Sequence, residues 1–358
     1  MFFCGTCGMM VRTETNICPK CSSTLAPAYV SEAAAARLTP ARKKLGKAAR
    51  VLLIGGIVLS LLAVATAITY HVVMRPGRSV YLLPEGNVLA YINFAPMHFM
   101  NMDTQSFTAD PEYQRLVNET GLRVDRDLEN IAISVNTDGG PGGDAAIIVT
   151  GTFDQQRLSG YMRKQEGVQT ETYGGKTIFS IPVKDQTARF CILDSKMVAL
   201  TVSSATQSMR SIIDKSAGSG AAPYLFENYY GDVPFASTMW AIVRVPSSAV
   251  PGPGPSGMNL NFLKNSVTIV SLRYTGSLRF RGEFIAENQT DATNIFQAVN
   301  GLLAMSKLAG GQQMNDPDAA AVMNSIEVKQ NGNHVVVSVV VPQDLIQKVA
   351  QKRQTHQL

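Results

Sequence analysis

The sequence predicts an α+β fold: a small N-terminal unit, one transmembrane helix, and a body of two similar strand-helix units with antiparallel sheets. Three observations predict it. Four of the five cysteines lie near the N-terminus, the run Val51–Met74 is apolar and uncharged, and strands alternate with amphipathic helices from Val80 onward. The predicted segments are 1–25, the basic connector 26–50, the span 51–74, unit 75–215, linker 216–236, unit 237–350 and tail 351–358.

The four N-terminal cysteines have the spacing of a metal site. Cys4 and Cys7 form one C-x2-C pair, and ten residues later Cys18 and Cys21 form a second pair. Four thiolates are the ligand set of a tetrahedral structural zinc site, which has no open position for catalysis. We therefore predict one structural Zn²⁺ ion. A unit of about twenty residues has too little core to fold without it.

This cysteine pattern resembles the short zinc-ribbon heads of bacterial single-pass membrane proteins. The resemblance covers residues 2–25 and places the four cysteines at the four ligand positions. Gly8 follows the first pair, as in that pattern, whereas Ser22 stands where a glycine commonly follows the last ligand. The resemblance implies a zinc ribbon and implies nothing about the role of the remaining chain.

The run Val51–Met74 is predicted to cross a membrane. Its 24 residues form a helix of roughly 36 Å at about 1.5 Å per residue, enough for a hydrocarbon core of about 30 Å. Six basic residues lie just before the run and two lie just after it. This excess of positive charge on the N-terminal side places the N-terminus in the cytoplasm. The predicted location is a bacterial inner membrane, with the body in the periplasm or otherwise outside the cytoplasm. A cleaved signal peptide is disfavoured because about fifty residues precede the run.

Charge is divided unevenly along the chain. Residues 1–50 hold eight Lys and Arg against two Asp and Glu, whereas residues 75–358 hold twenty-four against twenty-five. The body is therefore nearly neutral, which argues against a broad nucleic-acid surface on it. The basic connector 26–50 is predicted to contact anionic lipid headgroups rather than nucleic acid, because no aromatic side chain that could stack on bases lies among its charges.

The first unit of the body reads as strands followed by helices. Asn87–Phe94 is a predicted strand, and Asp110 caps a helix with Pro111 at its first position. Asp154 caps the next helix. The glycine-rich segment 136–144 lacks the Gly-Lys-Ser/Thr ending of a phosphate-binding loop and is predicted to be a hairpin loop. The remaining strands are 131–135, 145–150, 177–183, 188–193 and 197–202, before a helix that buries Ala205, Met209, Ile212 and Ile213.

The second unit repeats this pattern. Ser237–Pro246 matches Asn87–Pro96 in type and length, each an apolar strand that ends before a proline. Two hairpins follow, one from 267–274 and 277–286 and one around Asn331-Gly332. Between them lies a helical stripe from Ile295 to Leu303. The two copies either share one sheet or lie side by side.

No catalytic or cofactor-binding residues are predicted in the body. Three histidines lack the spacing of a metal site: His98, His334 and His356. Helix capping and solvation explain the acids Asp125, Asp127, Asp316 and Asp318. Core packing explains the methionine-rich segment Met97–Met102, with an apolar contact surface as the alternative. Cys191 reads as a buried strand thiol, with an intermolecular disulfide as the alternative.

These features predict a non-enzymatic, membrane-anchored envelope protein. Its zinc ribbon would recruit a protein partner in the cytoplasm, and its body would bind or scaffold a partner in the envelope. One alternative is a transmembrane signalling protein whose zinc ribbon contacts a cytoplasmic factor or DNA. The other is an envelope hydrolase with an unrecognised site.

Overall fold

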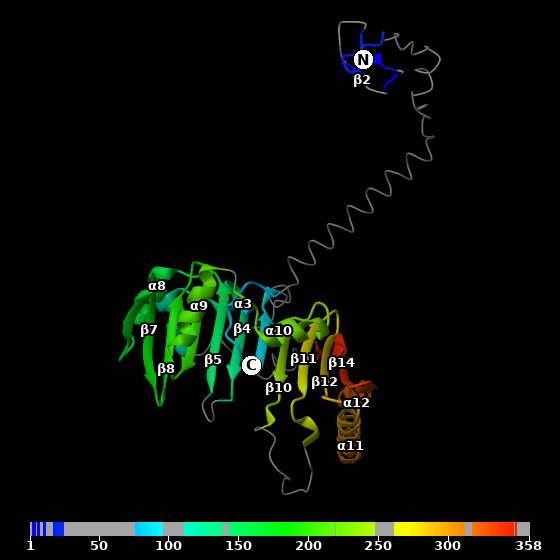
Figure 1. Cartoon of the computed structure of the whole chain (residues 1–358). Coiled ribbons are helices and arrows are strands. Elements are labelled where there is room, and N and C mark those ends of the chain that lie inside the picture. Colours follow the sequence, from blue (N-terminus) through cyan, green and yellow to red (C-terminus); the bar gives the residue numbers. More distant parts are fainter. Residues whose placement is uncertain are drawn as a thin grey trace, which may run out of the picture. The chain divides into compact units, whose positions relative to one another are not determined.

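The structure, a computed structural model, contains two compact units, Met1–His71 and Val72–Leu358 (Figure 1). The described residues are 2–4, 6–7, 10–11, 17–24, 76–95, 111–138, 143–218, 220–247, 261–311, 317–346 and 348.

The body is built on one twelve-stranded antiparallel sheet (Figure 1). In sheet order its strands are β13 (Glu327–Asn331), β14 (His334–Val341), β12 (Leu278–Ile285), β11 (Val267–Tyr274), β10 (Met239–Arg244), β3 (Val88–Asn93), β4 (Leu128–Asn136), β5 (Asp144–Gly151), β9 (Met197–Ser203), β8 (Gln186–Ile192), β7 (Lys176–Val183) and β6 (Gln169–Tyr173).

Helices pack on both faces of this sheet. They are α3 (Ser79–Leu82), α6 (Pro111–Thr120), α7 (Val124–Asp127), α8 (Gln155–Arg163), α9 (Gln207–Ala217), α10 (Tyr224–Tyr229), α11 (Gln289–Gly311) and α12 (Pro317–Asn324), with short 3-10 turns η1 (Tyr230–Asp232) and η3 (Asn261–Leu263).

The two copies share one sheet, which is one of the two arrangements that the sequence left open. The first strands of the two halves, β3 and β10, pair with each other, with Ala90 opposite Ala241. From this junction the halves run outward in the same order, β3-β4-β5-β9-β8 on one side and β10-β11-β12-β14-β13 on the other. Each half inserts a helix, α8 or α11, after its third strand. The two similar units are therefore halves of one sheet, since backbone pairing at their first strands joins them.

The main core lies on one face of the sheet. Side chains alternate between faces along a strand, and Leu89 and Ile242 on neighbouring strands are both buried on this face. Helices α3, α9 and α10 cover them through residues such as Leu82, Ile212 and Phe226. On the opposite face two smaller clusters form, one around Leu158, Phe153, Leu128 and Val198 and one around Ile295, Ala292, Ala286 and Val335.

The predicted transmembrane helix is also corrected. Within the part of the chain that the structure describes, no helix combines the length and the apolarity that a bilayer crossing needs. The longest helix described, α11, has 23 residues, but Asn294, Gln297 and Asn300 interrupt its apolar pattern. The run Val51–Met74 lies outside the described residues. The single-pass topology and the inner-membrane and periplasmic location depended on that span, and we do not retain them.

Several local predictions are confirmed. Asp154 caps α8, since its carboxylate accepts hydrogen bonds from the backbone N–H groups of Gln156 and Arg157. Gly121 follows α6 with a φ of +75°, and Gly332 turns the β13–β14 hairpin with a φ of +60°. The hairpin across segment 136–144 is present as β4 and β5.

The segment between the halves forms part of the core. Residues 216–236 were expected to be a linker, and the structure places α10 and η1 there. Leu225 and Phe226 of α10 are buried, and the Phe226 ring stacks on Tyr230 with centroids 4.6 Å apart. The segment packs beside the β3–β10 junction, because the Phe226 ring also lies 6.1 Å from Trp240 of β10.

Candidate metal centre

Two short turns build the N-terminal unit. β1 (Phe2–Phe3) pairs with β2 (Met10–Val11), and the first cysteine pair lies between these strands. In the second turn the N–H of Ser22 donates to the carbonyl of Cys18, and the N–H of Cys18 donates to the carbonyl of Ser23. A bridge between Ile17 and Thr24 closes this turn. Each C-x2-C pair is thus presented on its own tight turn, as the spacing predicts.

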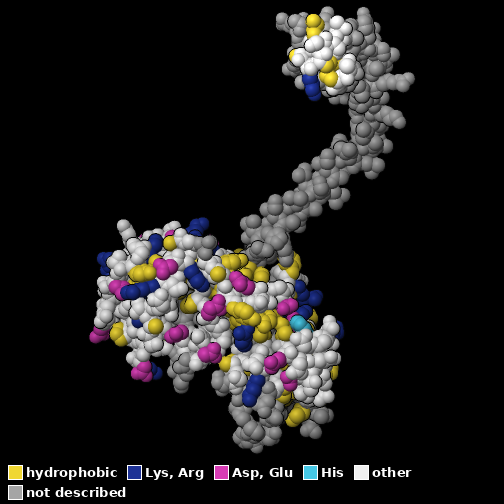
Figure 2. Space-filling view, viewed as in Figure 1, with side chains coloured by type: hydrophobic (Ala, Val, Ile, Leu, Met, Phe, Trp, Pro, Cys, Tyr) yellow, Lys and Arg dark blue, Asp and Glu magenta, His cyan; other side chains and the backbone are white. Residues whose placement is uncertain are grey.

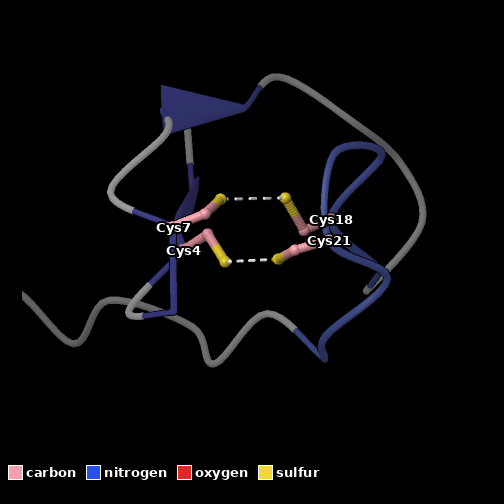
Figure 3. Close-up of side chains that lie close together, drawn as sticks. All are labelled: Cys4, Cys7, Cys18 and Cys21. Atoms are coloured by element: carbon pink, nitrogen blue, oxygen red, sulfur yellow. Dashed lines mark hydrogen bonds between the residues drawn. The ribbon is translucent and has the colours of Figure 1, made fainter.

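The four predicted ligands come together in space. The Sγ atoms of Cys4, Cys7, Cys18 and Cys21 all lie within 4.8 Å of one another. Cys4 pairs with Cys21 at 3.5 Å between sulfurs, and Cys7 pairs with Cys18 at 3.7 Å, so each contact joins the two turns (Figure 3). Cys4 and Cys18 are buried. Four converging thiols from two turns form a closed ligand set that can hold one metal ion.

Ser23 supports the thiolate forms of two ligands. Its Oγ lies 3.2 Å from the Cys4 Sγ and 2.9 Å from the Cys21 Sγ. The hydrogen bond with Ser23 is the largest cause that lowers the pKa of Cys4 to about 5, and it also lowers the pKa of Cys21. A metal binds the thiolate rather than the thiol. Ser23 was not among the predicted site residues, and the signal for it is its position two residues after the last ligand.

Ser22 explains how the second turn forms without the usual glycine. Its φ is +55°, in the left-handed region that favours glycine. The chain therefore keeps the backbone shape of a turn that commonly carries glycine at this position. The side chain of Ser22 is exposed, so a glycine fits there without loss of a contact.

Replacement of Ser23 by alanine is expected to make metal release occur at higher pH. A lowered thiol pKa keeps the ligand charged as pH falls, and metal binding is lost as pH falls through that pKa. Without the hydroxyl, the pKa of Cys4 returns toward its usual value and protons displace the metal sooner. The measurement is the metal content of the protein dialysed at a series of pH values.

The adjacent change Ser22→Gly is the matched control for this test. It removes a neighbouring hydroxyl, suits the left-handed backbone and is expected to leave the release midpoint unchanged. An equal midpoint for the native protein and Ser23→Ala would contradict the role of Ser23.

Within the part of the chain that the structure describes, the other candidate groups do not form a second metal centre. His334 contacts Glu283, with 2.8 Å between its Nδ1 and the carboxylate. Asp125 pairs with Arg123, whose hydrogen bond is the main cause that lowers the pKa of Asp125. Cys191 is buried, and burial raises its pKa to about 11. Asp127 accepts a hydrogen bond from the Arg123 N–H, and Asp318 pairs with Lys348. His98, His356, Asp316 and Met97–Met102 lie outside the described residues.

Comparison with known proteins gives only distant structural similarity. No family model matches the sequence, and no curated protein matches it. Crystal form I of TP0453 is 8% identical with a TM-score of 0.44, and the match covers 78% of this chain and 98% of that one. Crystal form IV is 9% identical with a TM-score of 0.44, covering 76% and 96%. At this level the similarity does not extend to function.

Proposed function

We propose that the N-terminal unit is a zinc ribbon that holds one structural Zn²⁺ ion. The observation that carries this proposal is the convergence of four cysteine sulfurs within 4.8 Å of one another. An all-thiolate tetrahedral set favours zinc among the common divalent ions, and a closed set gives the ion a structural role. Zinc binding then supplies the free energy that folds a unit this small.

The protein is, in our proposal, a non-enzymatic binding or scaffolding protein whose zinc ribbon recruits a protein partner. Ile17 supports the recruiting role, because 53% of this apolar residue is exposed beside a metal ligand. Ile17, which precedes the ligand Cys18, is the side chain that we assign to this contact. In the body, the described residues hold no further cluster of metal-ligating groups. On the visible face of the body, acidic and basic side chains are interspersed (Figure 2).

An affinity capture with three forms of the full chain tests this function. The native protein is expected to hold one zinc ion and retain a specific partner. Ile17→Ser is expected to keep the zinc and lose the partner, because it removes only the exposed apolar contact. Cys18→Ser is expected to lose both, since the ribbon depends on the metal.

Two outcomes would contradict the proposal. Retention of the same partner by Cys18→Ser would remove the ribbon from recruitment. Retention of that partner by Ile17→Ser would show that Ile17 is not part of the contact surface. Zinc content, measured on the same samples, separates a failed metal site from a failed contact.

A further inference from the structure

A cavity of about 340 Å³ lies beside the hairpin of β11 and β12 in the body. Its volume falls in the range of small-molecule sites, about 300–1,000 Å³. Basic, hydroxyl and apolar side chains line it, among them Arg273, Arg279, Arg281, Ser271, Ser338 and Phe235.

Three arginines share one face of the sheet at this cavity. Arg273 on β11 lies directly opposite Arg279 on β12 in the strand register. Arg281 is two residues beyond Arg279 and therefore points to the same face. Like charges directly opposite each other destabilise a strand pair. The pairing of Arg273 with Arg279 therefore weakens the hairpin.

One carboxylate in the cluster offsets only part of this charge. The Arg281 Nη2 lies 2.7 Å from a Glu283 oxygen, and the other Glu283 oxygen lies 2.8 Å from the His334 Nδ1. Glu283 is only 5% exposed and is held by these two partners. No described residue forms an ion pair with Arg273 or Arg279. Their contacts are with neutral oxygens, at 3.4 Å to the Phe235 carbonyl and 3.3 Å to the Ser277 hydroxyl.

Two of the guanidinium groups also hold buried donors without acceptors. The Nε atoms of Arg273 and Arg281 are buried and have no hydrogen-bond partner among the described residues. Such donors destabilise a fold unless an acceptor reaches them. A planar guanidinium presents its donors in a fork that matches the oxygens of a phosphate or carboxylate. An oxyanion in this cavity offsets the positive charge of the arginines that line it.

We propose that this cavity binds a small organic molecule through a phosphate or carboxylate group. Arg273 and Arg279 hold the oxyanion, and the Ser271 and Ser338 hydroxyls lie within the same cavity. Phe235, which is 52% exposed, gives an apolar wall for the remainder of the ligand. This inference rests on the binding role proposed for the body and gives that role a ligand class.

Isothermal titration calorimetry on the full, zinc-loaded chain tests it with three probes. Phenyl phosphate and phenylacetate carry the two oxyanions on a similar ring, and benzyl alcohol is the uncharged control. We expect saturable binding of at least one anion, weaker binding as salt screens the charges, and no binding of the alcohol. The tighter of the two anions identifies the group that the arginines recognise.

Arg279→Gln is expected to weaken anion binding about tenfold or more, because it removes charge-assisted hydrogen bonds. Its melting temperature is expected to stay equal or rise, since the change relieves repulsion with Arg273. Lys329→Gln removes the same charge from an exposed site on β13 and is expected to bind like the native protein.

The proposal is overturned if the native chain binds neither anion saturably, or if Arg279→Gln binds the anion with native affinity. A lower melting temperature in Arg279→Gln would also count against it, because the arginine would then serve the fold. Zinc content and partner capture by the ribbon do not depend on this cavity, so failure here is distinguishable from failure of the ribbon.

Discussion

Replacement of Cys18 by serine is expected to release the metal and unfold residues 2–24 while the body stays folded. Cys18 is fully buried and its sulfur contacts that of Cys7 across the centre. Zinc binding in such small units supplies on the order of 10–16 kcal/mol, which is also their folding free energy. Since Met1–His71 and Val72–Leu358 are separate compact units, the loss of folded structure is expected in the N-terminal unit alone.

Three readouts measure this effect. Zinc per chain is expected to fall from one to near zero, and protease is expected to cut within residues 2–24 of the variant but not of the native protein. The thermal unfolding of the body is expected to be unchanged. Cys191→Ala is the control, because it removes a cysteine outside the centre and should keep the zinc. Native zinc content in Cys18→Ser would contradict the four-cysteine assignment.

Replacement of Ile269 by alanine is expected to lower the free energy of unfolding of the whole body by about 2–5 kcal/mol. Ile269 is 1% exposed on β11 and lies beside Ile242 of β10 in the main core. Its neighbour Val270 points to the opposite face and is 48% exposed. Val270→Ala is the matched control and is expected to cost about 1 kcal/mol or less.

Urea unfolding followed by two signals measures this prediction. Trp240 is the one tryptophan of the chain, and it stacks on Tyr91 across the β3–β10 junction with ring centroids 5.7 Å apart. Because the two halves share one sheet, its fluorescence and the circular dichroism of the body are expected to change in one transition. Two separate transitions, or equal losses in the two variants, would contradict the single-sheet core.

Local sequence signals predicted the local parts of the structure. The two C-x2-C pairs predicted the metal centre, because a tight turn brings together two thiols that are only three positions apart in the sequence. Asp154 and the Asn331-Gly332 turn likewise act over two to four residues. The α+β pattern and the repeat of strand order followed from alternating and helical periodicities, which are also short-range.

Long-range pairing could not be obtained in this way. No feature of Val88–Asn93 indicates that it pairs with a strand about 150 residues later, so the choice between one sheet and two stayed open. The apolar character of Tyr224, Leu225 and Phe226 was the available signal that residues 216–236 are more than a linker.

The arginine cavity was not predicted, because it too depends on long-range strand pairing. The arginines themselves were visible in the sequence. Arg279 and Arg281 are two residues apart, and Arg273 precedes them across the turn at Gly276. The sequence spacing alone does not show that the three side chains share one face, because this also depends on the register of the hairpin. The apolar run Val51–Met74 shows the opposite case, since length and hydropathy alone gave a membrane assignment that the described structure does not support.

X-ray absorption at the zinc edge of the purified full chain tests the central claim most directly. The account predicts one zinc ion per chain with four sulfur neighbours at about 2.3 Å. A zinc-free protein, or a first shell in which nitrogen or oxygen replaces sulfur, would contradict it.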